Sequence, residues 1–283
     1  MNVRRAIFAG SWYPRNAAEC EREIRSFFED KNFKPVFKRN IIGGITPHAG
    51  WYFSGSIACN IVHSLREENP PEVIVIFGMH LHTGSPCYIM TDGLWETPFG
   101  EIQIESELSR ELTKRFSFII ETPKNYSEEN TIELQLPFIK YFFEDAKIVP
   151  IGVPPTKKAI EIGRAVAEIS SRMGMNLKLL GSTDLTHYGF NYGFAPKGTG
   201  LGAVDWVRNE NDAKIVETIL TMNPESVLRE GLESQNACCA GAAAAAIASA
   251  KGLGAESAEL VTYATSYDKS PGDSIVGYVG IVF

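Results

Sequence analysis

Three short apolar runs constrain the fold of this chain more than any other feature. They cover residues 41–46, 74–77 and 177–181, and each contains several Ile, Leu or Val residues. Runs of this length and composition are typical of strands that are buried on both faces of a sheet. Segments with helical spacing of apolar residues, such as 157–173, lie between the runs. This alternation predicts an α/β protein.

The pattern continues along the whole chain, and it predicts a three-layer α/β/α arrangement with a mixed, mostly parallel central sheet. Neither an internal repeat nor a linker interrupts the sequence, so we expect residues 1–283 to form a single domain. A helix is expected to begin near Ser127, with Glu128 and Glu129 as its solvated start. Pro137 should kink or restart this helix, because proline cannot donate a backbone hydrogen bond.

Composition excludes several classes of protein. Lys and Arg number 27 against 34 Asp and Glu, which gives a net charge of −7 and argues against nucleic-acid or anionic-membrane partners. No apolar run reaches the roughly 18–20 residues that cross a bilayer, and none resembles a signal peptide, so we expect a cytoplasmic protein. The five cysteines lack paired CxxC spacing, which argues against a disulfide framework or a structural zinc site.

Four of the five histidines follow the apolar runs. His48 follows the first run, His80 and His82 follow the second, and His187 follows the third. Ligands in open α/β sheets bind at the carboxyl ends of the strands, so this placement indicates a functional site. We expect one histidine of the second pair to be a ligand of the site and choose His82, with His80 as a further pocket residue.

Two other residues could belong to the same site. Asp184 precedes His187 by three residues and could orient its imidazole, although a helix N-cap would also explain the aspartate. Cys238 opens an alanine-rich helix, whose amino end favours the thiolate form. The alternative is that the thiol simply packs as a small apolar group, and this is our interpretation of Cys239. Imidazoles and a thiolate together suit Zn²⁺, Fe²⁺ or copper better than Mg²⁺ or Ca²⁺.

These residues resemble the Memo-like family, whose fold is similar to the catalytic subunit of class III extradiol ring-cleaving dioxygenases. The resemblance covers nearly the whole chain. It rests on six segments, which are Ala-Gly-Ser-Trp-Tyr-Pro at 9–14, Pro-His-Ala-Gly-Trp-Tyr-Phe-Ser-Gly at 47–55, Gly-Met-His-Leu-His-Thr-Gly at 78–84, Thr-Ile-Glu-Leu-Gln-Leu-Pro at 131–137, Ser-Thr-Asp-Leu-Thr-His at 182–187, and Cys238.

The resemblance implies a mononuclear metal site. The family's metal ligands fall on His48, His82 and Cys238, and its remaining site histidine falls on His187, with Asp184 beside it. In the related dioxygenases a glutamate replaces the cysteine and completes a two-histidine, one-carboxylate iron site. The remaining histidine acts there as an acid or base. Iron is therefore the expected metal, with copper and zinc as alternatives, and His187 and Asp184 are the expected catalytic residues.

Three departures from the family pattern affect this assignment. The segment that begins at Gly78 is one residue longer than the usual Gly-Pro-Asn/Ser-His, which leaves a choice between His80 and His82. Asn130 stands where the family often has a histidine, so a polar or proton-relay contact could be lost. Cys238-Cys-Ala-Gly-Ala replaces Cys-Gly-x-Gly-Pro, which leaves the turn before the helix less constrained.

The leading functional hypothesis is iron-dependent redox or dioxygenase-type chemistry on a small molecule. An alternative is a non-catalytic signalling module that binds a peptide or a metal in the same cleft, with Trp12, Trp51 and Tyr52 as aromatic walls. A third hypothesis is a metal-assisted hydrolase. Glu133 is a further pocket candidate that could add an oxygen ligand or a base. The resemblance also implies a radical-SAM protein as a functional partner, since prokaryotic family members often accompany one.

Overall fold

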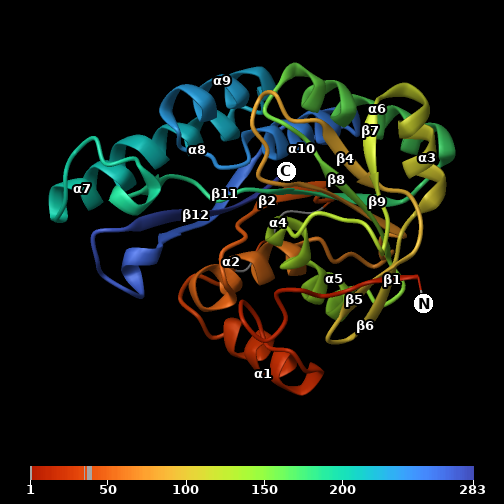
Figure 1. Ribbon diagram of the computed structural model, residues 1–283, viewed down its shortest axis with the longest axis horizontal. Coiled ribbons are helices and arrows are strands. Elements are labelled where there is room, and N and C mark those ends of the chain that lie inside the picture. Colours follow the sequence, from red (N-terminus) through yellow and green to blue (C-terminus); the bar gives the residue numbers. More distant parts are fainter. Residues whose placement is uncertain (1, 35, 37–39) are drawn as a thin grey trace.

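The computed structural model describes residues 2–34, 36 and 40–283. Within these residues a large mixed sheet forms the centre of the molecule (Figure 1). Along the sheet the strands are β10 (His187–Tyr188), β12 (Ile275–Val282), β2 (Gly43–Thr46), β9 (Leu177–Ser182), β3 (Val73–Gly78), β8 (Lys147–Gly152), β4 (Cys87–Met90) and β7 (Phe118–Glu121), and β11 (Glu259–Thr265) pairs with β12. A small second sheet contains β1 (Val3–Arg4), β5 (Leu94–Thr97) and β6 (Gly100–Gln103).

The centre of the large sheet is parallel. The pairs β2–β9, β9–β3 and β3–β8 all run in the same direction, whereas β12 is antiparallel to β2 and β4 is antiparallel to β8. All six residues of β3 are buried, as a strand covered on both faces requires. Ile74 and Ile76 pack into one apolar cluster, and Val75 and Phe77 pack into another on the opposite face.

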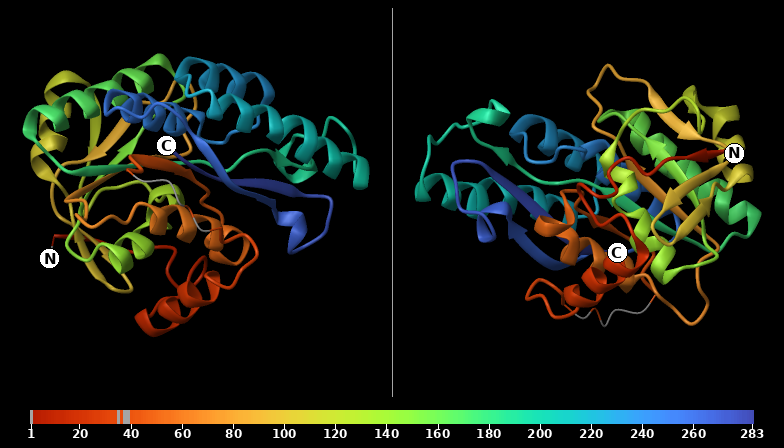
Figure 2. Two further views of the ribbon diagram at one scale, coloured as in Figure 1. Left: turned by 180° about the vertical axis from the view of Figure 1, so that it is seen from behind. Right: turned by 60° about the horizontal axis from the view of Figure 1, so that its bottom comes forward.

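Helices cover both faces of the sheet (Figures 1 and 2). On one face are α3 (Ser106–Arg115), α6 (Lys157–Met173), α8 (Asp212–Leu220), α9 (Pro224–Ser234) and α10 (Ala240–Gly252). On the other are α1 (Ala17–Phe27), α2 (Trp51–Ser64), α4 (Asn130–Glu133) and α5 (Leu136–Phe142). A short helix, α7 (Leu201–Trp206), continues through a π-helical turn at Val207–Asn211 into α8. The predicted α/β class and mixed sheet are confirmed.

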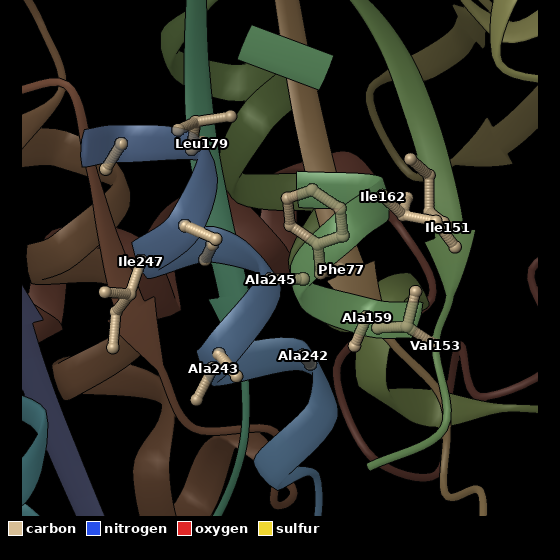
Figure 3. Packing of buried hydrophobic residues seen from close by; sticks show 14 of the residues in the cluster. Phe77, Ile151, Val153, Ala159, Ile162, Leu179, Ala242, Ala243, Ala245 and Ile247 are labelled. Carbon is tan, nitrogen blue, oxygen red and sulfur yellow. The ribbon is translucent and has the colours of Figure 1, made fainter. Parts of the chain in front are cut away.

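The alanine-rich segment is a helix, as its composition predicts. Alanines of α10 lie directly over the central strands, close to Phe77 and Leu179 and beside the residues of α6 (Figure 3). Small side chains let the helix axis approach the sheet closely. This packing fixes the amino end of α10, and with it Cys238 and Cys239, against the edge where β3 and β9 end.

The segment around Pro137 is two helices, with Pro137 in the first turn of α5. The predicted restart is therefore present. The predicted solvated start at Glu129 is wrong, because this residue is buried and its carboxylate accepts the backbone N–H groups of Thr131 and Ile132 as the N-cap of α4. Capping a buried helix end satisfies donors that would otherwise lack partners.

The strands β2, β9 and β3 are neighbours, and their carboxyl ends lie at one edge of the sheet. Thr46 is paired with Ser182, and Phe77 is paired with Gly181. The loops that follow these strands carry the candidate site residues. Within the described part of the chain, no helix is both long and apolar enough to cross a membrane.

Candidate metal centre

Four side chains from three separate loops meet at this edge. They are His48 after β2, His80 after β3, and Cys238 and Cys239 immediately before α10. One ligand atom from each lies within 4.8 Å of all the others. His48 Nε2 is 3.1 Å from His80 Nε2 and 3.3 Å from the Sγ atom of Cys238. The predicted convergence of remote loops is therefore present, with one difference in which histidine takes part.

His48 is buried, and its ring is held in one orientation. Its Nδ1 atom is 3.0 Å from the hydroxyl of Ser182, and that hydroxyl donates its own proton to the carbonyl of Thr131 at 2.7 Å. Ser182 can therefore only accept from Nδ1–H. This leaves the lone pair of Nε2 free to point at the cluster, which is the tautomer that a metal ligand needs.

The backbone around Cys238 holds its sulfur in place. The N–H of Asp184 donates to Sγ at 3.3 Å, and the N–H of Cys238 donates to the carbonyl of Asp184 at 3.1 Å. Burial alone would raise the pKa of the Cys238 thiol. The contact with Cys239 and the positive charge on His48 outweigh burial and lower that pKa well below its usual value. This shift favours the thiolate of Cys238, the form that binds metals.

The pKa of the His48 imidazole shifts in the opposite direction, upward. Burial disfavours its charge, but the Asp184 carboxylate and the Cys238 sulfur outweigh burial and raise the pKa of His48 to about 9. Without a metal, the two shifts favour an imidazolium–thiolate pair. A bound cation would replace the shared proton, because it binds the same two lone pairs.

The structure brings His80 to the cluster and places His82 outside it. Met79 has a left-handed backbone conformation, with φ of 74°, and this turn directs His80 toward His48. His82 is exposed, and its Nδ1 atom accepts the N–H of Gly84 at 3.2 Å. We expected His82 to be the ligand, but the geometry places His80 in the cluster instead, because the chain does not stay extended after β3.

Gly78 allows that turn to form. A Cβ atom at this position would lie 2.3 Å from the Oγ1 atom of Thr131, so only glycine fits between β3 and α4. The same hydroxyl accepts the N–H of Met79 at 2.7 Å. The start of α4 therefore sets the path of the chain from β3 to His80.

Asp184 and His187 lie beside the cluster as predicted. Asp184 accepts the backbone N–H of His48 at 2.7 Å, and its Oδ2 atom is 3.8 Å from Nε2 of His187. The ring of His187 stacks on Tyr192 at 5.1 Å. Burial disfavours the charged form of His187, but Asp184 and the Cys238 sulfur together raise its pKa above the usual value.

A cleft of about 600 Å³ opens onto these residues. His48, His80, Asp184 and His187 all line it. Most of the remaining lining consists of aromatic rings and hydroxyl groups, contributed by Trp12, Tyr52, Phe53, Tyr192 and Tyr278 and by Ser11, Ser266, Ser270 and Ser274. No Lys or Arg side chain is among the described residues that line it. Imidazole, carboxylate, aromatic and hydroxyl groups therefore line one cleft.

The structure separates the other pocket candidates. Trp12 and Tyr52 line the cleft and are 40% and 63% exposed. Trp51 is buried and stacks on Phe138 at 4.2 Å, so it belongs to the core. Glu133 is also buried away from the cleft lining.

Glu133 supports the segment that carries Trp12. Its carboxylate accepts the N–H groups of Ile7 and Phe8 and the hydroxyl of Tyr13. Burial raises the pKa of this carboxyl, and the three donors only partly compensate. Glu133 is therefore a structural residue that fixes one wall of the cleft.

Asn130 keeps a polar contact where the family often has histidine. Its side-chain amide donates to the carbonyl of His48 at 3.0 Å, and it lines the cleft. Compared with a histidine at this position, Asn130 therefore keeps the polar contact and lacks only a group that can titrate. Sequence reasoning missed the serines at 266, 270 and 274, although three serines in nine residues between two strands were a usable signal.

Comparison with known proteins shows the family to which the chain belongs. The family described as Memo-like protein matches residues 4–282. A MEMO1 family protein of Pyrococcus furiosus is 35% identical over 289 residues, which cover 99% of this chain and 98% of the relative. A MEMO1 family protein of Pyrococcus horikoshii is 36% identical, with 97% of each chain covered.

A solved structure has a similar fold. It is a protein of Escherichia coli K12 described as uncharacterized, with a TM-score of 0.50, 9% identity, and coverage of 86% of this chain and 100% of that chain. This likeness concerns the fold alone, because identity is so low. The family match and the two relatives each cover nearly all of the sequence. The chain therefore belongs to the Memo-like family.

Proposed function

We propose that this protein binds one metal ion through His48, His80 and Cys238 and uses it for redox chemistry on a small molecule in the adjacent cleft. The observation that carries the proposal is the approach of His48 Nε2 to both the His80 nitrogen and the Cys238 sulfur, at 3.1 Å and 3.3 Å. Three unrelated loops supply these atoms. Burial in the core does not account for this convergence, because Cys238 is only partly buried and His80 is exposed.

The donor set supports a thiophilic transition metal. Imidazole and thiolate ligands suit iron, copper and zinc, whereas Mg²⁺ and Ca²⁺ prefer oxygen. Ser182 fixes the His48 tautomer, and the Asp184 N–H stabilises negative charge on the sulfur. We propose iron as the native metal, with copper and zinc as the alternatives. A bound iron ion would supply one-electron redox chemistry and Lewis acidity at this point.

The protein's own groups would position and protonate the substrate. His187 reaches the cleft and its pKa is raised, which favours the protonated ring, so it can donate a proton to a substrate oxygen. Asp184 holds this proton on the imidazole, and Tyr192 fixes the plane of the ring. The aromatic walls would bind an apolar ring, and the serine hydroxyls would bind its polar substituents.

Metal analysis of the protein, purified without oxygen, tests the proposal. We expect a stoichiometric thiophilic metal in the wild type and its loss in His48→Ala. His82→Ala is the matched control, since His82 lies two residues from His80 but outside the cluster. Oxygen uptake with a series of catechols should then depend on the metal. A wild-type protein that binds no iron, copper or zinc on reconstitution would refute the proposed centre.

The exposed aromatic rings favour a second candidate function, which is binding without turnover. Trp12 and Tyr52 expose much of their surface beside the cleft, a feature common at sites that bind peptides. In this case, a peptide library should yield ligands whose affinity is reduced by Trp12→Ala. The metal-loaded protein would then consume no oxygen with any catechol.

A further inference from the structure

The sulfur atoms of Cys238 and Cys239 lie on the same side of the chain, 3.7 Å apart. Side chains of adjacent residues in an extended strand point in opposite directions. At Cys239 the backbone adopts φ of −127° and ψ of 52°, just before the first turn of α10. This conformation turns the sulfur of Cys239 toward the cluster. Packing as a small apolar group therefore does not fully explain the position of this side chain.

Three of the six pairwise separations within the cluster are close to those of ligands around one tetrahedral ion, and none of the six exceeds 4.8 Å. Two thiolates on such an ion lie about 3.8 Å apart, because each metal–sulfur bond is about 2.3 Å long. A thiolate and an imidazole nitrogen lie about 3.5 Å apart, and two such nitrogens about 3.3 Å apart. The corresponding distances here are 3.7 Å, 3.3 Å and 3.1 Å, each slightly shorter than its tetrahedral value.

We propose that Cys239 is a fourth protein ligand, so that this chain binds its metal with two thiolates and two imidazoles. The inference rests on the metal-binding function proposed above. Without a metal, the Cys239 thiol donates to the carbonyl of Met79 at 3.5 Å. Binding of the cation releases this thiol proton to solvent and forms the second metal–sulfur bond, with no transfer of electrons.

The four ligands are not equivalent. Groups outside the cluster position three of them, which we call the inner ligands. His48 Nδ1 is hydrogen-bonded to Ser182, and the N–H of Asp184 donates to the sulfur of Cys238. The backbone N–H of Cys239 donates to the hydroxyl of Thr183 at 3.1 Å. His80 is exposed, and among the described residues its ring contacts are with His48 and Cys238, which are themselves ligands. The inner three therefore retain the ion, and His80 is the ligand that a molecule in the cleft can replace.

Cobalt substitution tests the number of sulfur ligands without relying on activity. The near-ultraviolet charge-transfer absorbance of Co²⁺ proteins increases with each thiolate bound to the ion. We expect the wild-type protein loaded with Co²⁺ under anaerobic, reducing conditions to lose about half of this absorbance in Cys239→Ala. The affinity for Zn²⁺ should fall in the same variant, whereas affinity for Mn²⁺, which prefers oxygen and nitrogen, should change little.

Two controls make the outcomes distinct. Cys59→Ala removes another buried thiol, outside the cluster, and should retain the full absorbance. Cys239→Ser keeps the side-chain size if the alanine variant folds poorly by circular dichroism. Full absorbance in a folded Cys239 variant would overturn the fourth ligand but leave the metal centre intact. Absence of the band in the wild type would overturn the metal centre itself.

Discussion

Asp184 and Asp212 are both buried carboxylates, and both accept a backbone N–H near β10, yet their surroundings differ. Asp184 accepts the N–H of His48 and lies within 4 Å of two imidazoles. Asp212 accepts the N–H and hydroxyl of Thr186 and the hydroxyl of Tyr263 at 2.7 Å. The first carboxylate has partners that can carry charge, whereas the direct hydrogen-bond partners of the second are neutral.

This difference separates the chemical role proposed for Asp184 from the structural role of Asp212. Burial raises the pKa of Asp212 to about 6, since neutral donors compensate only part of the lost hydration. Asp184 instead raises the pKa values of the histidines beside it. A buried carboxylate next to imidazoles and an open cleft can control proton positions. One enclosed by hydroxyl groups mainly holds two segments together.

The largest expected effect is that of Gly277→Ala. A Cβ atom here would lie 2.0 Å from the Oδ2 atom of Asp212, and Gly277 also exchanges backbone hydrogen bonds with the 185–186 segment. We expect a loss of about 3 kcal/mol or more in the free energy of unfolding, by urea denaturation. Gly272→Ala, with open space around it, is the control. An unchanged midpoint would show that the Asp212 region is not tightly packed.

Asp212→Asn tests the same region through pH. The folded pKa lies above the unfolded one, so proton binding at Asp212 stabilises the fold below about pH 4, and this contribution is lost as pH rises through 6. Relative to the wild type, the variant should gain on the order of 3 kcal/mol between pH 4 and pH 7. Denaturation at a series of pH values measures this difference. A constant difference would mean that Asp212 is ionised throughout.

Ser182→Ala tests the cluster beside Asp184, through the orientation of the His48 ring. Loss of the hydroxyl frees the His48 ring to adopt the other tautomer, so we expect metal affinity to fall about 10- to 100-fold. Ser249→Ala is the matched control, because Ser249 is equally buried and its hydroxyl has no hydrogen-bond partner among the described residues. Competition with a chromophoric chelator gives both affinities. Equal losses would indicate general destabilisation.

The smallest effect is expected for His82→Ala. His82 is exposed and contacts its own loop, through the N–H groups of His82 and Gly84. Metal affinity should change less than about twofold, within the range of ordinary surface substitutions. A large loss, measured by the same competition, would mean that the loop rearranges and that His82 replaces His80 as the ligand.

The fold was largely predictable from the sequence because strands buried in a parallel sheet appear as short, continuous apolar runs. The runs at 41–46, 74–77 and 177–181 became β2, β3 and β9, and His48, Asp184 and His187 followed from their positions at the strand ends. Position relative to a strand end is a local property, so it is visible in one sequence.

The choice between His80 and His82 was not predictable. It depends on the left-handed conformation of Met79, a residue type that carries no signal for positive φ. The role of Cys239 was hidden for a related reason. An alanine-rich surrounding correctly indicates burial, but it does not reveal toward which neighbour a buried sulfur points.

The separation of the ligands along the chain has a consequence for biosynthesis. Cys238 and His48 are 190 positions apart, and β2 lies between β9 and the still later strand β12. A ribosome must therefore release most of the polypeptide before the cluster can assemble. Binding of the proposed metal would then follow translation, and a cell short of the ion would accumulate chains that lack their metal.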